Sequence, residues 1–317
     1  MYRNVCTKMK LGSILFLLLF CKGGCQIING VKAGLGQFPF VVQVHPRKPE
    51  IEVDLQNKHL TSPTLAGSGV IIGRKFVLTA AHLVRKEIKV SGRKTGVYRN
   101  YGEVYVVAGN LHLDYEPFGF IKKKAETIIA HPSYDSQPDT YDIALLHLEQ
   151  PFPFNDQSLG TSSIEMATKG PAVGDNCMIM GWGKTSWRWT ETENGKIEAE
   201  YLDPTNYLMW GRTKISNTCS SRYRREEFIC GWHFGYYPGY SLTAKGDSGS
   251  PLVCLDEATG RNKLYGTHIG GDGDRPAVYT KLSFYRNWID MWVEYFQGVE
   301  EDQINNEIFD IMNDLNN

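Results

Sequence analysis

The chain has no apolar run of transmembrane length. A spanning helix needs about 20 apolar residues, and Leu11–Phe20, "LGSILFLLLF", provides ten. Charge of one sign is also not in excess, because 34 Lys and Arg residues face 35 Asp and Glu residues. We therefore expect no membrane, nucleic-acid or cationic partner. The sequence lacks an H-E-x-x-H motif and paired Cys/His spacings, so no metal and no cofactor is expected.

The N-terminus carries the features of a secretory signal. Arg3, Lys8 and Lys10 precede the short apolar run, and the small residues of "CKGGC" follow it. This order of basic, apolar and small residues is typical of a signal peptide, which we predict at residues 1–25. We expect the mature protein to be soluble, secreted and extracellular.

Cysteine is scarce in the rest of the chain. Three of the seven cysteines, Cys6, Cys21 and Cys25, lie in or beside the signal. The even set that remains after cleavage consists of Cys177, Cys219, Cys230 and Cys254. Disulfides form in an oxidising compartment, and four cysteines permit three pairings that the sequence alone does not separate.

Short apolar runs between turn residues dominate the chain from residue 27 to about 285. Examples are "FVVQV" at 40–44, "IALLHL" at 143–148 and "CMIMGWG" at 177–183. Runs of this kind, rich in β-branched and aromatic residues, favour an all-β sandwich or barrel. We expect surface loops in the polar stretches 46–63 and 184–206.

The C-terminal region has a different pattern. Residues 284–297 suit a helix, with Gly298 placed to stop it. Residues 299–317 hold six acids and no base. Apolar residues within them still recur at helical spacing, at Ile304, Ile308, Ile311 and Leu315. We predict an acidic amphipathic tail at 298–317.

Ser248 lies in "KGDSGSP", an unusual setting for a plain turn. A serine nucleophile needs a base, commonly histidine, and that base needs an orienting acid. His82 closes the apolar run "FVLTAAHLV", and Asp142 opens the run "DIALLHL". A single histidine after a strand is more often structural, and an aspartate before a strand is a common turn residue. The order His, Asp, Ser is more specific, because a known catalytic triad has it.

These motifs together resemble those of the chymotrypsin-like (trypsin-fold) serine proteases. The matching stretches are "IINGVKAGLGQFPF" at 27–40, "LTAAH" at 78–82, "DIALL" at 142–146, "GWGKT" at 181–185, "GDSGSPL" at 246–252 and "PAVYT" at 276–280. The resemblance covers residues 27 to about 297, and we assign 26–297 to one protease domain. It implies an all-β fold of two six-stranded antiparallel β-barrels with a C-terminal helix.

The resemblance also implies roles for individual residues. Ser248 would attack the scissile carbonyl, His82 would act as base and then acid, and Asp142 would orient His82. Main-chain N–H groups of Gly246 and Ser248 would form the oxyanion hole. Asp247 would pair with the α-amino group of Ile27, as in a zymogen switch.

The chain departs from the family pattern at two disulfides. Leu83 and Gly67 stand where one cysteine pair is usual, and Ala244 replaces a cysteine of the bridge across the specificity pocket. The remaining cysteines match two family bridges, Cys177–Cys254 and Cys219–Cys230. A missing bridge costs about 2–5 kcal/mol, which packing must replace.

The implied specificity pocket is also unusual. Leu242 occupies its floor, where trypsins have aspartate, and Gly271 and Ala277 stand at its walls. Leucine offers no counter-charge for Lys or Arg, although Asp272 or Asp274 could reach in. We therefore expect a specificity unlike that of trypsin.

The sequence thus predicts a monomeric serine endopeptidase, made as a zymogen, that acts on polypeptides and meets protein protease inhibitors. The alternative is a catalytically weak or inactive relative that serves as a binding or regulatory protein. The altered pocket, the lost pocket bridge and the acidic tail favour that alternative. The intact triad and Gly246 favour the enzyme.

Overall fold

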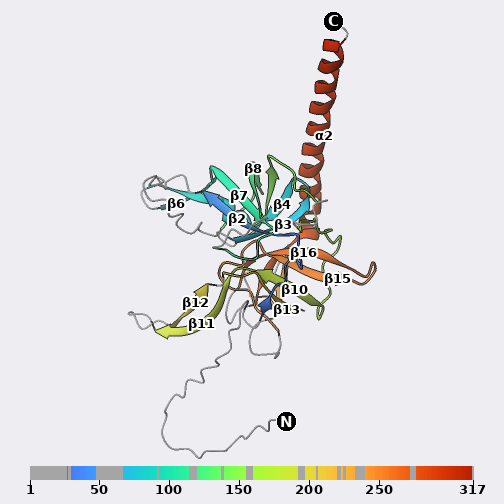
Figure 1. The fold of residues 1–317 in the computed structure, drawn as a ribbon. Coiled ribbons are helices and arrows are strands. Elements are labelled where there is room, and N and C mark those ends of the chain that lie inside the picture. The colour runs from blue at the N-terminus through green and yellow to red at the C-terminus, as the bar shows by residue number, and fades with distance from the viewer. Residues whose placement is uncertain are drawn as a thin grey trace, which may run out of the picture.

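A computed structural model gives the fold of this protein (Figure 1). It describes residues 27, 30–47, 67–90, 93–113, 120–136, 139–154, 160–191, 197–204, 206–219, 223, 226–232, 240–271 and 276–315. The predicted signal at 1–25 and most of the polar stretch 46–63 lie outside these residues.

The first barrel consists of six antiparallel strands in the order β2-β3-β4-β9-β8-β7, which closes on itself. Their bounds are β2 Val41–Arg47, β3 Gly67–Gly73, β4 Phe76–Thr79, β7 Glu103–Ala108, β8 Ile121–Ala130 and β9 Ala144–Leu148. Alternate residues of β7 are buried, as expected when one face of a strand meets a core. Every residue of β4 and β9 is buried, and these two strands pair with each other.

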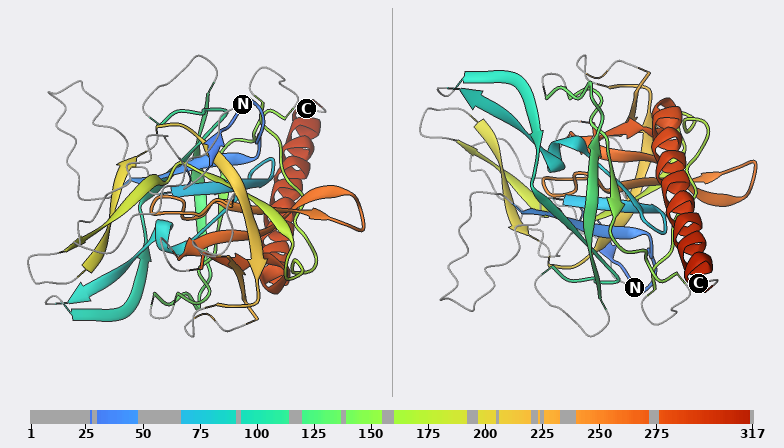
Figure 2. Two further views of the ribbon diagram at one scale, coloured as in Figure 1. Left: turned by 90° about the horizontal axis from the view of Figure 1, so that it is seen from below. Right: turned by 90° about the horizontal axis from the view of Figure 1, so that it is seen from above.

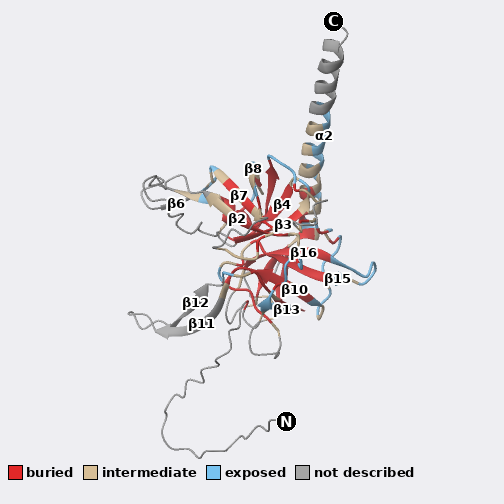
Figure 3. Ribbon diagram, in the orientation of Figure 1, coloured by how far each residue is buried: buried red, intermediate tan, exposed pale blue. Residues whose placement is uncertain are grey.

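The second barrel follows from the order β13-β10-β15-β16-β17-β14, because β14 also pairs with β13 and closes the ring. Its strands are β10 Asn176–Gly181, β13 Met209–Ser216, β14 Phe228–Gly231, β15 Pro251–Asp256, β16 Arg261–Gly270 and β17 Val278–Lys281. The short strand β1, Val31–Lys32, adds to β13. Buried residues fill both barrels (Figure 3). The predicted two-barrel fold with a C-terminal helix is confirmed.

Both disulfides implied by the resemblance are present in the second barrel. Cys177 and Cys254 are directly opposite on β10 and β15, with Cα atoms 4.3 Å apart. Cys219 and Cys230 join β14 to the segment that follows β13, with Cα atoms 5.6 Å apart.

Two β-ribbons extend from the barrels on the side away from the C-terminal helix (Figure 2). One pairs β5, Arg85–Val90, with β6, Arg93–Asn100. The other pairs β11, Lys184–Glu191, with β12, Ile197–Pro204. The prediction of a surface loop at 184–206 is therefore wrong, because the two halves of this stretch pair as strands. The dipeptide Asn194-Gly195 between them is a strong hairpin signal that pointed to this outcome.

The chain ends in a single long helix, α2, which spans Leu282–Leu315. Leu282, Tyr285 and Ile289 at its start are buried in a core cluster with residues of both barrels, and the later part of the helix projects beyond the body (Figure 1). Gly298 does not stop the helix, so that prediction is wrong. The turn beyond Gly298 is held by Glu300, whose carboxylate lies 2.8 Å from Lys75 Nζ and 3.1 Å from His147 Nε2. This tertiary contact outweighs the poor helix propensity of glycine.

Aromatic stacking strengthens the same contact. The Phe296 ring stacks on the His147 imidazole with centroids 4.2 Å apart. The helix that the spacing of Ile304, Ile308, Ile311 and Leu315 predicted is present, since α2 runs to Leu315. No helix in the described ranges combines the length and apolarity needed to cross a membrane.

The substitution Gly298→Ala should stabilise the protein by about 0.5–1 kcal/mol, because alanine costs less backbone entropy in a helix. A Cβ atom at Gly298 would meet no heavy atom within 4 Å. Urea unfolding measures the gain. Gly260→Ala is the control: its surroundings are equally open, but its φ of +65° should make the change destabilising. A loss of stability in Gly298→Ala would show that the helix is not continuous at this residue.

Candidate active site

His82 is presented to solvent by the short helix α1, Ala81–Val84, which follows the buried strand β4. Ala80 is extended and turns the chain into this helix. Ala81, Leu83 and Val84 are buried, while 30% of the His82 side chain is exposed. One turn of helix therefore anchors three apolar residues and leaves the imidazole at the surface.

Asp142 holds His82 through two hydrogen bonds. Its Oδ2 atom lies 2.7 Å from His82 Nδ1, and its Oδ1 atom accepts from the His82 main-chain N–H at 2.9 Å. The carboxylate is 1% exposed. Burial of the ring opposes its charge, yet the neighbouring Asp142 carboxylate brings a net rise in the pKa of His82. Because Nδ1 is engaged with Asp142, Nε2 is the nitrogen left for proton transfer.

Ser248 lies on a tight loop between Ala244 and Ser250. Asp247 N–H donates to Ala244 O at 3.0 Å, and Ser250 N–H donates to Asp247 O at 2.9 Å. The Ser248 carbonyl accepts from Ser68 N–H at 2.7 Å, which ties the loop to the first barrel. Over the described ranges the Ser248 hydroxyl forms no hydrogen bond, and none joins it to His82. Such bonds often tighten only when substrate is bound.

Two glycines give this loop its shape. Gly246 has a φ of +103°, and a Cβ there would lie 3.0 Å from the Gly183 Cα atom. Gly249 has a φ of +76°, and a Cβ there would collide with the Ser68 carbonyl. The N–H groups of Gly246 and Ser248 have no acceptor within the described part of the chain. Two free donors on one loop can bind an oxyanion.

Leu83 packs where the resemblance led us to expect a disulfide. A Cβ at Gly67 would lie 2.6 Å from Leu83 Cδ1, so glycine leaves the room that this side chain fills. Leu83 Cδ1 also lies 3.1 Å from the Cβ position of Gly249. Van der Waals contact thus joins α1 to the Ser248 loop without a covalent bond.

Asp247 is fully buried directly before Ser248. Its carboxylate accepts from the N–H groups of Gly183 and Ala244, each at 2.8 Å. Burial raises the pKa of Asp247 to about 6, although these two hydrogen bonds act in the opposite direction. Within the described ranges no cation reaches it. Ile27 is also fully buried, and in this uncut chain its nitrogen belongs to a peptide bond.

The residues assigned to the specificity pocket are all near the second barrel. Leu242 is 5% exposed and Ala277 is 2% exposed. Gly271 has a φ of +79°, and a Cβ there would collide with the Pro276 carbonyl, so it forms a tight turn. Asp272 and Asp274 lie outside the described residues.

Asp139 is a residue near the site that the sequence reasoning missed. Tyr223 donates a hydrogen bond to its Oδ2 atom at 2.8 Å, and its charge helps to raise the pKa of His82. Its φ is +61°, a left-handed conformation that is uncommon outside glycine. Its position three residues before Asp142 was the only sequence signal.

In the described part of the chain no group of His, Cys, Asp and Glu is arranged to hold a metal ion.

Comparison with known proteins is consistent with this geometry. "Transmembrane protease serine 9" of Rattus norvegicus is 27% identical over 271 residues, which are 83% of this chain and 22% of that protein. "Glandular kallikrein" of Sus scrofa is 28% identical over 225 residues, 70% of this chain and 83% of that protein. The chain therefore spans only about a fifth of the first relative's length.

The family description "Trypsin" matches residues 27–289. This range includes both barrels and the first turns of α2. The chain therefore belongs to the trypsin family of serine proteases.

Proposed function

We propose that this protein is a secreted serine endopeptidase that hydrolyses peptide bonds through Ser248, His82 and Asp142. The observation that carries the proposal is that the Asp142 carboxylate forms two hydrogen bonds with His82, one with ring Nδ1 and one with the main-chain N–H. Asp142 is 1% exposed, and burying a carboxylate is costly unless it is paired. The His82 side chain is nevertheless 30% exposed, and the next residue, Leu83, packs at the Ser248 loop, as expected for a base that meets substrate.

The reaction follows from these positions. His82 Nε2 takes the proton of the Ser248 hydroxyl as Oγ attacks the substrate carbonyl. The oxygen that becomes negative is stabilised by the N–H groups of Gly246 and Ser248. His82 then gives its proton to the leaving amine, and the acyl group stays on Ser248. Water, deprotonated by His82, attacks this ester; His82 then returns the proton to Ser248 Oγ as the acid product leaves.

Electrostatics favour this proton transfer. The tetrahedral intermediate requires an imidazolium at His82, and the Asp142 carboxylate raises the pKa of that ring. The positive charge therefore forms next to a buried negative charge, where the attraction is poorly screened.

We infer that the substrates are polypeptides cut after uncharged residues and that the enzyme acts as a monomer without a metal or cofactor. Protein protease inhibitors are further candidate partners. Secretion is supported by the signal-like N-terminus and by two disulfides, which form in oxidising compartments.

We further infer that the enzyme is activated by release of the Ile27 α-amino group. Ile27 is buried among Ala167, Cys177 and Ile179 in the second barrel, close in the fold to the strand that leads to Gly181. A free ammonium there would give Asp247 a cation, which the described part of the uncut chain does not supply. The ion pair would then stabilise the Ser248 loop.

Ser248→Ala and His82→Ala should each lower peptidase activity about 10⁴- to 10⁶-fold, because triad members act as a unit. Turnover of a peptide substrate and labelling by a phosphonate probe measure the effect. Thermal unfolding of both variants should resemble that of the parent protein, which separates loss of chemistry from loss of fold. Near-normal turnover by Ser248→Ala would exclude the triad.

Cleavage should occur after apolar or small residues and rarely after Lys or Arg. Burying a substrate cation against Leu242 without a partner costs about 2 kcal/mol or more. A peptide library gives the profile, and Leu242→Asp should shift it toward Lys and Arg. A parent profile dominated by Arg would refute this specificity.

Uncut protein should lose stability as the pH rises from about 4 to 6. Asp247 has a folded pKa of about 6 against an ordinary value of 3.8, so the folded chain binds the proton more tightly than the unfolded chain. The free energy of unfolding should fall by about 2–3 kcal/mol across this window. Urea unfolding of uncut Ser248→Ala protein measures it. In the same protein with Asp247→Asn, the free energy of unfolding should fall less steeply with pH. An unchanged pH dependence would refute the role of Asp247.

Full activity should require removal of Gln26. Signal cleavage after Cys25 would leave Gln26 as the first residue, and a terminal glutamine can cyclise and lose its charge. The Asp247 carboxylate would then lack the cation that the Ile27 ammonium would supply. N-terminal sequencing of the active secreted form, compared with protein engineered to begin at Ile27, decides the matter. Equal activity with residues retained before Ile27 would show that the switch is not used.

A further inference from the structure

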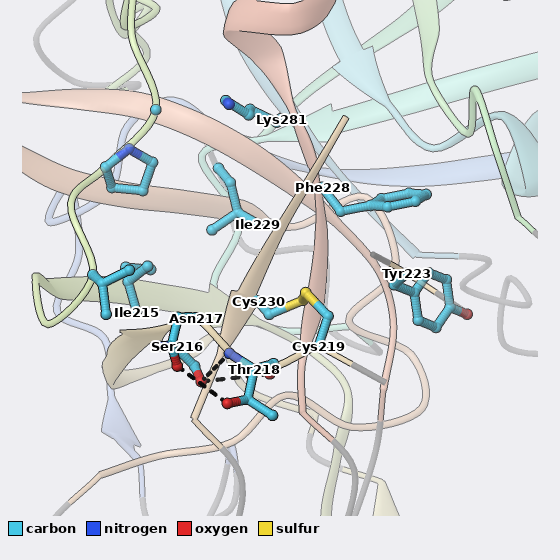
Figure 4. Close-up of a pocket in the computed structure, with 13 residues that line it drawn as sticks. Ile215, Ser216, Asn217, Thr218, Cys219, Tyr223, Phe228, Ile229, Cys230 and Lys281 are labelled. Atoms are coloured by element: carbon cyan, nitrogen blue, oxygen red, sulfur yellow. Dashed lines mark hydrogen bonds between the residues drawn. A yellow bond between two sulfur atoms is a disulfide. The ribbon is translucent and has the colours of Figure 1, made fainter. Parts of the chain in front are cut away.

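The second barrel contains a groove of about 600 Å³ that none of His82, Asp142 and Ser248 lines. Its apolar lining residues include Ile215, Phe228, Ile229 and the Cys219–Cys230 disulfide. Figure 4 shows Lys281 at one end and the polar turn Ser216–Thr218 at the other. A volume of this size is typical of ligand sites.

The groove exists because the barrel wall is incomplete at this point. β13 and β14 pair only at Ile215↔Gly231 and Ser216↔Cys230, and β13 ends at Ser216. Phe228 and Ile229 therefore pair with β17 alone, opposite Thr280 and Tyr279. Among the described residues, no strand pairs with the side of β14 that would meet a longer β13.

Lys281 is the only charged residue that lines the groove in the described part of the chain. It is half-buried at the end of β17, and its side chain lies over Gly170. A Cβ at Gly170 would be 2.8 Å from Lys281 Cε and 3.4 Å from Nζ, so glycine makes room for it. Among the described residues the ammonium has no hydrogen bond or ion pair. A half-buried cation beside apolar side chains favours an anionic partner.

The polar end of the groove is already satisfied. Thr218 N–H donates to Ser216 Oγ at 2.9 Å, and Thr218 Oγ1 donates to Asn217 Oδ1 at 3.1 Å. These groups bond to one another within the turn. Lys281 is thus the strongest recognition element for a charged ligand.

We propose that the groove binds an extended acidic segment of a partner polypeptide. An Asp or Glu carboxylate would pair with Lys281, and an adjacent apolar side chain would pack on Phe228 and Ile229. The open side of β14 favours a peptide, because an extended main chain can bind along an unpaired strand edge. The groove does not include the catalytic residues, so this binding is independent of the proposed function.

Fluorescence anisotropy of a labelled peptide tests the proposal. The probe is the amidated hexapeptide Gly-Asp-Phe-Glu-Val-Gly, and the protein is the full chain with Ser248→Ala, so that no cleavage occurs. We expect saturable binding that weakens with added salt. The matched peptide with Asn and Gln in place of Asp and Glu should bind about tenfold more weakly, as loss of a charged hydrogen bond implies.

Variants locate the site. Lys281→Gln keeps the aliphatic packing and should weaken binding about tenfold. Val173→Glu adds a repelling charge at a lining residue that is 62% exposed, so it should weaken binding without affecting the fold. Lys169→Gln, an exposed lysine beside Gly170 that does not line the groove, is the control and should have no effect.

Three results would overturn the proposal. One is no saturable binding of the acidic peptide at millimolar concentration. Another is binding that Lys281→Gln and Val173→Glu leave unchanged. The third is displacement by N-acetylphenylalanine at the same concentration as the unlabelled peptide, which would mean that any apolar carboxylate suffices. Every experiment here measures peptide binding and not peptidase activity, so a negative result would not contradict the proposed peptidase function.

Discussion

The Asp247 carboxylate, with no exposed surface, lies against the main chain at Gly181 and Gly183, and both glycines are required by its position. A Cβ at Gly183 would lie 2.5 Å from the Asp247 Cγ atom, and a Cβ at Gly181 would collide with Oδ1. The carboxylate accepts from Gly183 N–H and thereby fixes the residue before Ser248. Gly246 then takes its left-handed conformation against Gly183, and the two free N–H groups of the loop follow from that path. The glycines of "GWG" and "GDSG" are thus two halves of one packing arrangement around a buried charge.

The candidate site is assembled where the two barrels meet, and hydrogen bonds across that boundary hold it. His82 and Asp142 belong to the first barrel, while Ser248 belongs to the second. Ser68 N–H donates to the Ser248 carbonyl at 2.7 Å, and Thr280 Oγ1 donates to the Asp142 carbonyl at 2.9 Å. Leu83 adds an apolar contact at the place where the resemblance led us to expect a disulfide. Buried hydrogen bonds and close packing are both intolerant of small shifts, so together they can keep the site rigid without that bridge.

The C-terminal helix is a second means of support for the first barrel. His147 lies on β9, the strand that follows Asp142, and is 3% exposed. Its ring stacks on Phe296, its Nδ1 atom lies 3.3 Å from Glu126, and its Nε2 atom lies 3.1 Å from Glu300. These contacts reach α2 beyond residue 289, where the match to the family description ends. Phe296 and Glu300 therefore anchor α2 to the strand that follows Asp142.

The apolar runs of the sequence predicted an all-β chain, and the resemblance of its motifs to the chymotrypsin-like proteases implied the two-barrel fold and the residues of the candidate site. Alternating apolar runs specify strands locally, and the motifs around His82, Asp142 and Ser248 identified the family by their order. Local sequence patterns predicted the structure less well at positions where contacts with residues distant in the chain decide the conformation. The sequence around Gly298 predicts the end of a helix, yet α2 continues past it because Glu300 contacts Lys75 and His147. The replacement of a disulfide by Leu83 over Gly67, the charge of Asp139 near His82 and the open side of β14 all depend on residues far apart in the chain. Only the tertiary structure decided them, because packing and hydrogen bonding between such residues depend on the folded backbone and not on neighbours in sequence.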